Sequence, residues 1–199
     1  METHMENNKM LYSHVSVDCV LLGVNEDKLC VLLIERQMDN SDEKRYKLPG
    51  SLIFENEDLD TAAHRVFNEA TGLKRVPLKQ FRSFGSPSRT KNKDDMQWLE
   101  NAMKLKIERI VTVAYLALSK IGRKSNPTNK YNSLAWFPVD ALPSLPFDHK
   151  EIIEAAVEEI REWVEKEPSI IFDYLPLKFT AYQLRRTYEI IYNKEMDVR

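Results

Sequence analysis

Near its N-terminus the chain has two apolar stretches that are separated by a short polar cluster. Residues 14–22 (HVSVDCVLL) first alternate between polar and apolar positions and then become continuously apolar. Residues 29–34 (LCVLLI) form a second apolar run, and the cluster 25–28 (NEDK) between the two is rich in turn-forming residues. This arrangement predicts a β-hairpin.

Two later stretches repeat their apolar residues at helical spacing. The first follows Leu48-Pro49-Gly50, and its apolar positions are Leu59, Ala62, Ala63, Val66, Phe67 and Ala70. The second covers residues 149–165 and has Ile152, Ile153, Ala156, Val157, Ile160 and Val164 on one face. Both patterns predict helices that bury a single face, and Gly72 is well placed to end the first.

The remaining segments complete a mixed pattern. Further strands are expected at 80–84, 109–118 and 134–138, with polar loops at 38–44 and 122–132. Residues 94–106 form a charged insertion, helix or loop, that carries Trp98. The order of strands, helix, strands and helix indicates an α+β domain.

The chain changes character after Glu167-Pro168, because proline disfavours helix in the residue before it. We therefore expect one domain over residues 11–167 and a basic appendage over 168–199. Thr180 is suited to cap a helix that ends near residue 193.

Composition narrows the function classes. The 199 residues are 43% hydrophobic and 30% charged, with a formal net charge of -2. The hydrophobic content is enough to bury a core. The near-neutral net charge means that any contact with nucleic acid must come from a local basic patch. Cys19 and Cys30 lack metal-ligand spacing and are expected to be buried free thiols. No apolar run reaches the roughly 20 residues of a membrane span, and the polar first ten residues lack a signal-peptide core, so we expect a cytoplasmic protein without membrane contact.

One stretch carries candidate chemistry. Residues 51–73, SLIFENEDLDTAAHRVFNEATGL, resemble the Nudix signature G-x5-E-x7-R-E-U-x-E-E-x-G-U, where U is aliphatic. Glu57, Arg65, Glu69, Gly72 and Leu73 match it, whereas Ser51 stands in place of the first glycine. The resemblance implies a Nudix-like α/β/α sandwich with a mixed sheet.

The departures from this signature bear on activity. Nudix enzymes hold divalent metal ions on a ridge of glutamates, but here Val66 and Ala70 replace two of the three helix glutamates. Positions 66, 69 and 70 share one helix face, so only Glu69 remains to offer an oxygen ligand. We therefore expect no enzyme activity, no catalytic residues, no metal and no cofactor. Glu69 and Arg65 are expected to form a structural pair, with Glu57 near the helix start.

Flanking segments extend the resemblance over about residues 11–199. They include 29–37 (LCVLLIERQ), 84–89 (FGSPSR), 113–118 (VAYLAL), 136–140 (WFPVD) and 147–149 (FDH). Together they resemble the NrtR family of Nudix-related transcription regulators, which join a Nudix-like sensor to a C-terminal winged helix. Residues 175–191 resemble the first helix of that winged helix and 193–199 the turn after it, so we expect this domain to continue beyond Arg199.

The resemblance implies an operator-binding homodimer, of the repressor type. Because the first helix of a helix-turn-helix crosses the DNA backbone, its polar residues would contact phosphates. The candidate DNA-binding residues are Lys178, Tyr182, Gln183, Arg185, Arg186 and Arg199. The alternative is a solvated basic face on a packing helix.

A regulator also needs an effector. The polar residues expected to line its site are Asp18, Arg36, Lys47, Arg89, Tyr115, Asp148 and His149. Each has a structural alternative: Asp18 and Arg36 as a cross-strand pair, His149 as a helix cap, and Arg89 as a surface residue.

Two effector classes occur in the resembled family, ADP-ribose and pentose sugars such as L-arabinose (the AraR type). Arg89 is followed by Thr-Lys-Asn-Lys-Asp-Asp, not by the Arg-Asp-Pro-Arg loop of the ADP-ribose pattern. We therefore predict a sugar, with ADP-ribose next and with Trp98 and Trp136 as candidate stacking residues. The alternative functions are a Nudix hydrolase using Glu55, Glu57 and Glu69, and a ligand-binding module that acts through a protein partner.

Overall fold

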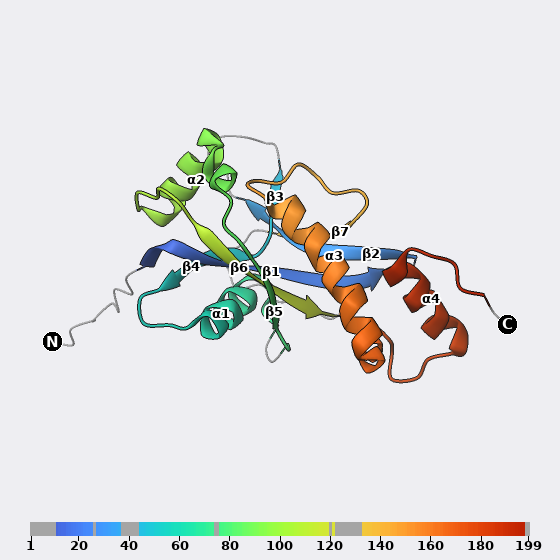
Figure 1. Cartoon of the computed structure of the whole chain (residues 1–199). Coiled ribbons are helices and arrows are strands. Elements are labelled where there is room, and N and C mark those ends of the chain that lie inside the picture. The colour runs from blue at the N-terminus through green and yellow to red at the C-terminus, as the bar shows by residue number, and fades with distance from the viewer. Residues whose placement is uncertain are drawn as a thin grey trace.

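A mixed sheet forms the centre of the protein (Figure 1). The computed structural model describes residues 11–25, 27–36, 44–73, 76–119, 121 and 133–197. Their elements, in chain order, are β1 (Leu11–Asn25), β2 (Lys28–Arg36), β3 (Arg45–Lys47), β4 (Gly50–Phe54), α1 (Leu59–Thr71), β5 (Lys79–Phe84), the 3-10 helix η1 (Pro87–Thr90), α2 (Lys93–Met103), β6 (Val111–Leu118), β7 (Leu134–Pro138), α3 (His149–Lys166), the 3-10 helix η2 (Pro168–Asp173) and α4 (Ala181–Tyr192).

β1 organises the sheet. It pairs with β6 in parallel and with β2 and β4 in antiparallel, and the main strand order is β3-β2-β1-β6-β5. β7 adds to β2, and β5 and β3 are antiparallel to their neighbours. The predicted hairpin, in which Asn25 pairs with Lys28, and the predicted strands at 80–84, 109–118 and 134–138 are thus present, the middle one starting at Val111.

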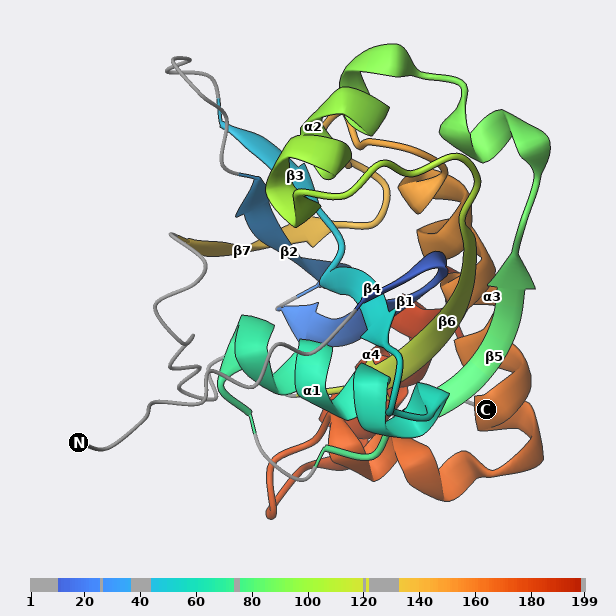
Figure 2. The ribbon, with the colours of Figure 1, turned by 90° about the vertical axis from the view of Figure 1, so that its left-hand side faces the viewer.

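Two apolar layers cover the two faces of the sheet (Figure 2). On one face α1 packs Ala62, Val66 and Phe67 against odd-numbered β1 residues such as Cys19. On the other face α3 packs Ile153 and Ile160 with the even-numbered residues of β1. This is the predicted α/β/α sandwich, and Cys19 and Cys30 are the predicted buried free thiols.

The helices follow their sequence signals closely. α1 begins after Asp58, whose side chain accepts the Thr61 amide, and ends at Gly72, where a φ of 68° favours glycine. The insertion forms the helix α2. Thr180 and Gln183 form a capping box at the start of α4, as the predicted cap required. Strands β3 and β4 were not predicted, because β3 has three residues and β4 lies in a stretch read as a loop.

Residues 168–197 pack onto the domain formed by the preceding residues. Ile170, Ile171 and Ile191 belong to the same buried cluster as α3. The predicted boundary at 167 coincides with the end of α3, but the tail does not build a core of its own. Among the described residues no helix is long and apolar enough to cross a membrane. The predicted loops at 38–44 and 122–132 lie almost entirely outside the described residues.

Candidate effector site

Arg89 is the centre of a buried polar cluster on the α3 face of the sheet. Its Nη2 donates to Asp18 Oδ2 at 2.8 Å, and its Nη1 donates to Asp148 Oδ1. All three side chains are at most 9% exposed. The turn Ser86-Pro87 starts η1 and so points Arg89 inward: Ser86 accepts the Ser88 amide, and the proline fits the first turn of the helix. Arg89 is therefore not the surface residue of the alternative interpretation.

His149 and Lys47 complete this cluster. His149 Nδ1 accepts the Leu48 amide at 3.2 Å, which leaves Nε2 as the protonated nitrogen, 3.6 Å from Asp18 Oδ1. Lys47 Nζ donates to the carbonyl oxygens of Leu48 and Gly50 at 3.1 and 3.0 Å. Gly50 makes room for the site, because any Cβ there would overlap the Asp18 carboxylate.

Burial and charge set the protonation of the cluster. Burial alone would raise the pKa of Asp18, but His149 and Arg89 outweigh it, and the pKa is lowered. Burial raises the pKa of Asp148 despite the opposing charge of Arg89. Burial lowers the pKa of His149 to about 4, against the opposing effect of Asp18. At neutral pH the cluster thus contains a neutral imidazole and an Arg89 shared between two carboxyl groups.

Arg36 lies next to this cluster and is held by the inserted helix. It binds Asp95 of α2 and stacks its guanidinium 4.0 Å from the centroid of the Trp98 ring. Asp95 also accepts the Phe147 amide at 3.3 Å. Arg36 therefore pairs with Asp95, and Asp18 pairs with Arg89, so the cross-strand pair of the alternative interpretation does not form.

A small pocket of about 40 Å³ lies among these residues. It is lined by Ser16, Asp18, Lys47, Gly50, Ser51, Leu52, Arg89, Thr90, Trp98, Leu99, Ile110, Phe147 and His149. Of the seven predicted effector residues, the structure thus brings together Asp18, Lys47, Arg89, Asp148 and His149, with Arg36 beside them.

Tyr115 lies elsewhere. It pairs with Cys19 in the β1–β6 register and belongs to the cluster under α1, on the opposite face of the sheet. Its hydroxyl donates to Asp60 Oδ1 at 2.7 Å. Alternation along β6 gives odd and even positions opposite faces, so Tyr115 cannot share a face with Asp18 in this register.

The residues that match the Nudix signature are used structurally. Arg65 donates from Nε to Glu57 Oε2 at 3.0 Å and lies 3.8 Å from Glu69. Val66 and Ala70 are buried in the apolar layer, at 1% and 0% exposure. The described residues contain no group of three side chains suited to a metal ion. With Glu69 as the remaining carboxylate among positions 66, 69 and 70, these residues do not fit the divalent metal ions that the Nudix signature implies.

Five of the six predicted DNA-binding residues lie on or just before α4, at the far end of the molecule from α2 (Figure 1). Lys178 is exposed, Tyr182 is 62% exposed and Gln183 is part of the helix cap. Arg185 lies 3.6 Å from Glu189. Arg199 lies outside the described residues.

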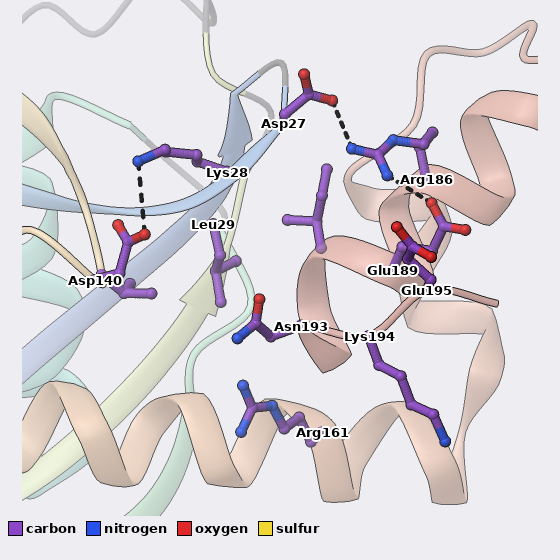
Figure 3. Close-up of a pocket in the computed structure, with 12 residues that line it drawn as sticks. Asp27, Lys28, Leu29, Asp140, Arg161, Arg186, Glu189, Asn193, Lys194 and Glu195 are labelled. Atoms are coloured by element: carbon purple, nitrogen blue, oxygen red, sulfur yellow. Dashed lines mark hydrogen bonds and ion pairs between the residues drawn. The ribbon is translucent and has the colours of Figure 1, made fainter.

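Arg186 forms ion pairs with carboxylates of the same chain. It lies between Asp27 and Glu189 (Figure 3). Its Nη2 is 2.7 Å from Asp27 Oδ1 and its Nη1 is 2.6 Å from Glu189 Oε2, and the residue lines a pocket of about 420 Å³. Arg161 of α3 reaches into the same region and donates from Nε to the carbonyl oxygen of Ile191 at 2.9 Å. The alternative interpretation, a packing helix with a charged face, therefore describes Arg186 in this structure.

Sequence reasoning missed Ser16, Asp95 and Phe147. Ser16 lies two residues before Asp18 in a strand, so the shared face was a usable signal. Asp95 lies three residues before Trp98 on a helix, which also places the two on one side. Phe147 has a φ of 53°, and nothing in the sequence indicated it.

The buried neutral His149 predicts a pH dependence of stability. Its pKa is lower in the folded protein than in the unfolded chain, so the stabilisation is present above about pH 6.5 and is lost as the pH falls towards 4. The effect amounts to about 3 kcal/mol at most. Chemical denaturation across this range should show a flatter slope for His149→Gln than for wild type. The exposed His64→Gln is the control, and an equal change in both variants would contradict the assignment.

Comparison with known proteins agrees with this architecture. The sequence profile of the NUDIX domain matches residues 12–158. The chain therefore belongs to the NUDIX domain family.

One relative is the ADPR responsive transcriptional repressor NtrR of Acinetobacter baylyi, 27% identical over 188 residues, which are 92% of this chain and 68% of NtrR. The crystal structure of a MutT/nudix family protein from Enterococcus faecalis matches with a TM-score of 0.70 at 24% identity, over 98% of this chain and 78% of that one. Shewanella oneidensis NrtR complexed with a 27mer DNA matches with a TM-score of 0.68 at 23% identity, over 92% and 78%. The NUDIX domain of that NrtR complexed with ADP ribose matches with a TM-score of 0.56 at 24% identity, over 75% and 89%.

Proposed function

We propose that this chain is the effector-binding part of a transcriptional repressor and has no hydrolase activity. The observation that carries the proposal is the cluster of Asp18, Arg89, Asp148 and His149, which forms the buried polar centre of the domain. The position of the Nudix metal ridge is taken instead by the buried apolar side chains of Val66 and Ala70. The role of NtrR as a transcriptional repressor supports the same conclusion.

The effector is proposed to bind at this cluster. NtrR responds to ADP-ribose, which makes that compound one candidate. The sequence favours a sugar such as L-arabinose, and the cluster supports this choice, because both Nη atoms of Arg89 are already bound to carboxylates. A diphosphate would need unpaired guanidinium groups, whereas a neutral sugar needs carboxylate partners and an aromatic wall.

Operator DNA is proposed to bind through the segment from residue 168 onward, as the start of a winged helix in a cytoplasmic homodimer. Of the predicted contacts that the structure describes, Lys178, Tyr182 and Gln183 are exposed, whereas Arg185 and Arg186 are half-buried. Arg185 would join the three exposed residues as a phosphate contact. Effector binding would shift the population between conformations with different DNA affinity.

Titration calorimetry without metal tests the proposal. We expect saturable binding of L-arabinose or of ADP-ribose, and no turnover of ADP-ribose when Mg²⁺ is then added. The Val66→Glu/Ala70→Glu variant is not expected to restore hydrolase activity. Both positions are buried, so a glutamate at either would be unpaired in the core.

Magnesium-dependent release of products by the wild-type chain would overturn the proposal in favour of a hydrolase that uses Glu55, Glu57 and Glu69. Effector binding without operator binding by the full-length gene product would instead favour a module that acts through a protein partner.

A further inference from the structure

Arg186 joins two parts of the chain that are far apart in the sequence. It lies in the middle of α4, and its Nη2 donates at 2.7 Å to Oδ1 of Asp27, the residue directly before β2. Its Nη1 donates to Glu189 Oε2 at 2.6 Å. Figure 3 shows the guanidinium group between the two carboxylates. Both Nη atoms of Arg186 are thus bound to acidic side chains of the same chain.

The helix face that meets Asp27 is the face that the sequence assigned to DNA. Four residues spaced i, i+3, i+4 and i+7 lie on this side of α4, and they are Tyr182, Arg185, Arg186 and Glu189. The guanidinium carbon of Arg185 lies 5.4 Å from the centroid of the Tyr182 ring, and its Nε lies 3.6 Å from Glu189. Asp27 therefore binds α4 where contacts with phosphate groups are expected.

Other contacts position α4 beside α3 without Arg186. Ile191 is fully buried in the apolar cluster that includes α3, and its carbonyl oxygen accepts from Arg161 Nε at 2.9 Å. The Tyr192 hydroxyl donates in return to the carbonyl oxygen of Arg161 at 3.1 Å. The side chain of Asp27, in contrast, is 76% exposed, so water readily replaces Arg186 as its partner. The ion pair can therefore open while the helix stays docked.

A DNA phosphate and Asp27 compete for the same donor. Carboxylate and phosphate oxygens both accept charge-assisted hydrogen bonds from guanidinium groups. A phosphate that approaches Arg186 while the pair is closed also comes close to two carboxylates, which repel it. Contact between Arg186 and the DNA backbone therefore requires the pair with Asp27 to open. Glu189 is three residues further along the same helix and moves with Arg186.

We propose that Asp27 is an internal competitor of DNA, which occupies Arg186 and thereby lowers the affinity of α4 for the phosphate backbone. This inference rests on the proposed function, because it presupposes that the segment from residue 168 onward contacts DNA. It adds Arg186 as a phosphate contact that is available only when the pair is open. The β1–β2 hairpin thus regulates DNA affinity through one exposed ion pair.

The test measures binding of a short fluorescein-labelled DNA duplex of mixed sequence to the full chain at low salt, by fluorescence anisotropy. Asp27→Asn keeps the size of the side chain but removes its charge, and it should tighten binding roughly two- to fivefold, the effect of one exposed ion pair. Asp140→Asn is the matched control. It removes the same charge from the same pocket, but its carboxylate is 68% exposed and pairs with Lys28. We expect a smaller gain in affinity for this control.

Two further measurements assign the effect to Arg186. In the Arg186→Gln background, Asp27→Asn should tighten binding no more than Asp140→Asn does, because the phosphate contact that it would free is absent. Nuclear magnetic resonance provides a measurement without DNA. The Nε–H signal of Arg186, identified by its loss in Arg186→Gln, should shift in Asp27→Asn and stay in place in Asp140→Asn.

The outcomes distinguish this inference from the proposed function. Equal gains in Asp27→Asn and Asp140→Asn, or a full gain that persists without Arg186, would overturn the competition and leave DNA binding by the segment standing. An unchanged Arg186 signal in Asp27→Asn would show that the pair does not form in solution and would also overturn it. If neither the wild-type chain nor any variant binds the duplex at low salt, the proposed DNA contact fails, and the competition fails with it.

Discussion

Replacing Arg89 by methionine is expected to lower the free energy of unfolding by roughly 3–5 kcal/mol, the cost of breaking a buried ion pair by removing one partner. The loss is large because Arg89 serves Asp18 and Asp148 at once, and both carboxyl groups would then be buried without a cation. Urea denaturation at pH 7 measures the change. The deficit should shrink as the pH is lowered towards 5, since protonation relieves unpaired carboxylates.

Arg82→Met is the matched control for this experiment. Arg82 is exposed on β5, and surface substitutions usually change stability by less than about 0.5 kcal/mol. An Arg89→Met variant with wild-type stability at pH 7 would contradict the described cluster. Effector binding to the variant with unchanged affinity would separately contradict the role of Arg89 in the site.

The second large effect is expected for Asp95→Asn. The substitution keeps the shape of the side chain but leaves the Arg36 guanidinium, whose side chain is 3% exposed, without its counter-ion. Arg36 Nε already lacks a hydrogen-bond partner among the described residues, so other compensation is scarce. We expect a loss of about 3 kcal/mol in unfolding free energy and faster amide exchange throughout α2.

Asp94→Asn controls for this change closely. Asp94 is the preceding residue in the first turn of the same helix, but it is exposed. Both substitutions remove a negative charge from the helix N-terminus, an effect of about 0.3–1 kcal/mol. Only the difference between the two variants reports the pair with Arg36. If the two variants are equally stable, the buried pair does not stabilise the fold.

The sequence allowed much of the fold to be predicted because the strongest signals were local. The spacing in α1 and α3, the glycine at position 72 and the Thr180 cap each determine structure within a few residues. β3 and β4 escaped prediction because pairing with β2 and β1, and not their own composition, makes them strands.

The site was harder to predict, since its geometry depends on contacts far apart in the chain. Alternation shows which residues of a strand share a face, but it does not say which face carries the site. For that reason Tyr115 was grouped with Asp18, although the register places it under α1. The choice of Asp95 as the partner of Arg36 likewise depends on how α2 folds back over the sheet.

Two long elements, β1 and α3, each extend from the proposed effector site to the region around α4. β1 carries Asp18 at the site and leads into the turn with Asp27, and α3 begins at His149 and carries Arg161 beside α4. His149 and Arg161 are about 18 Å apart along the axis of α3. α3 thus runs from α4 to the proposed effector site, which lies at its N-terminal end. A tilt of about 10° at that end would move the C-terminal helix by about 3 Å, with no hinge needed between them.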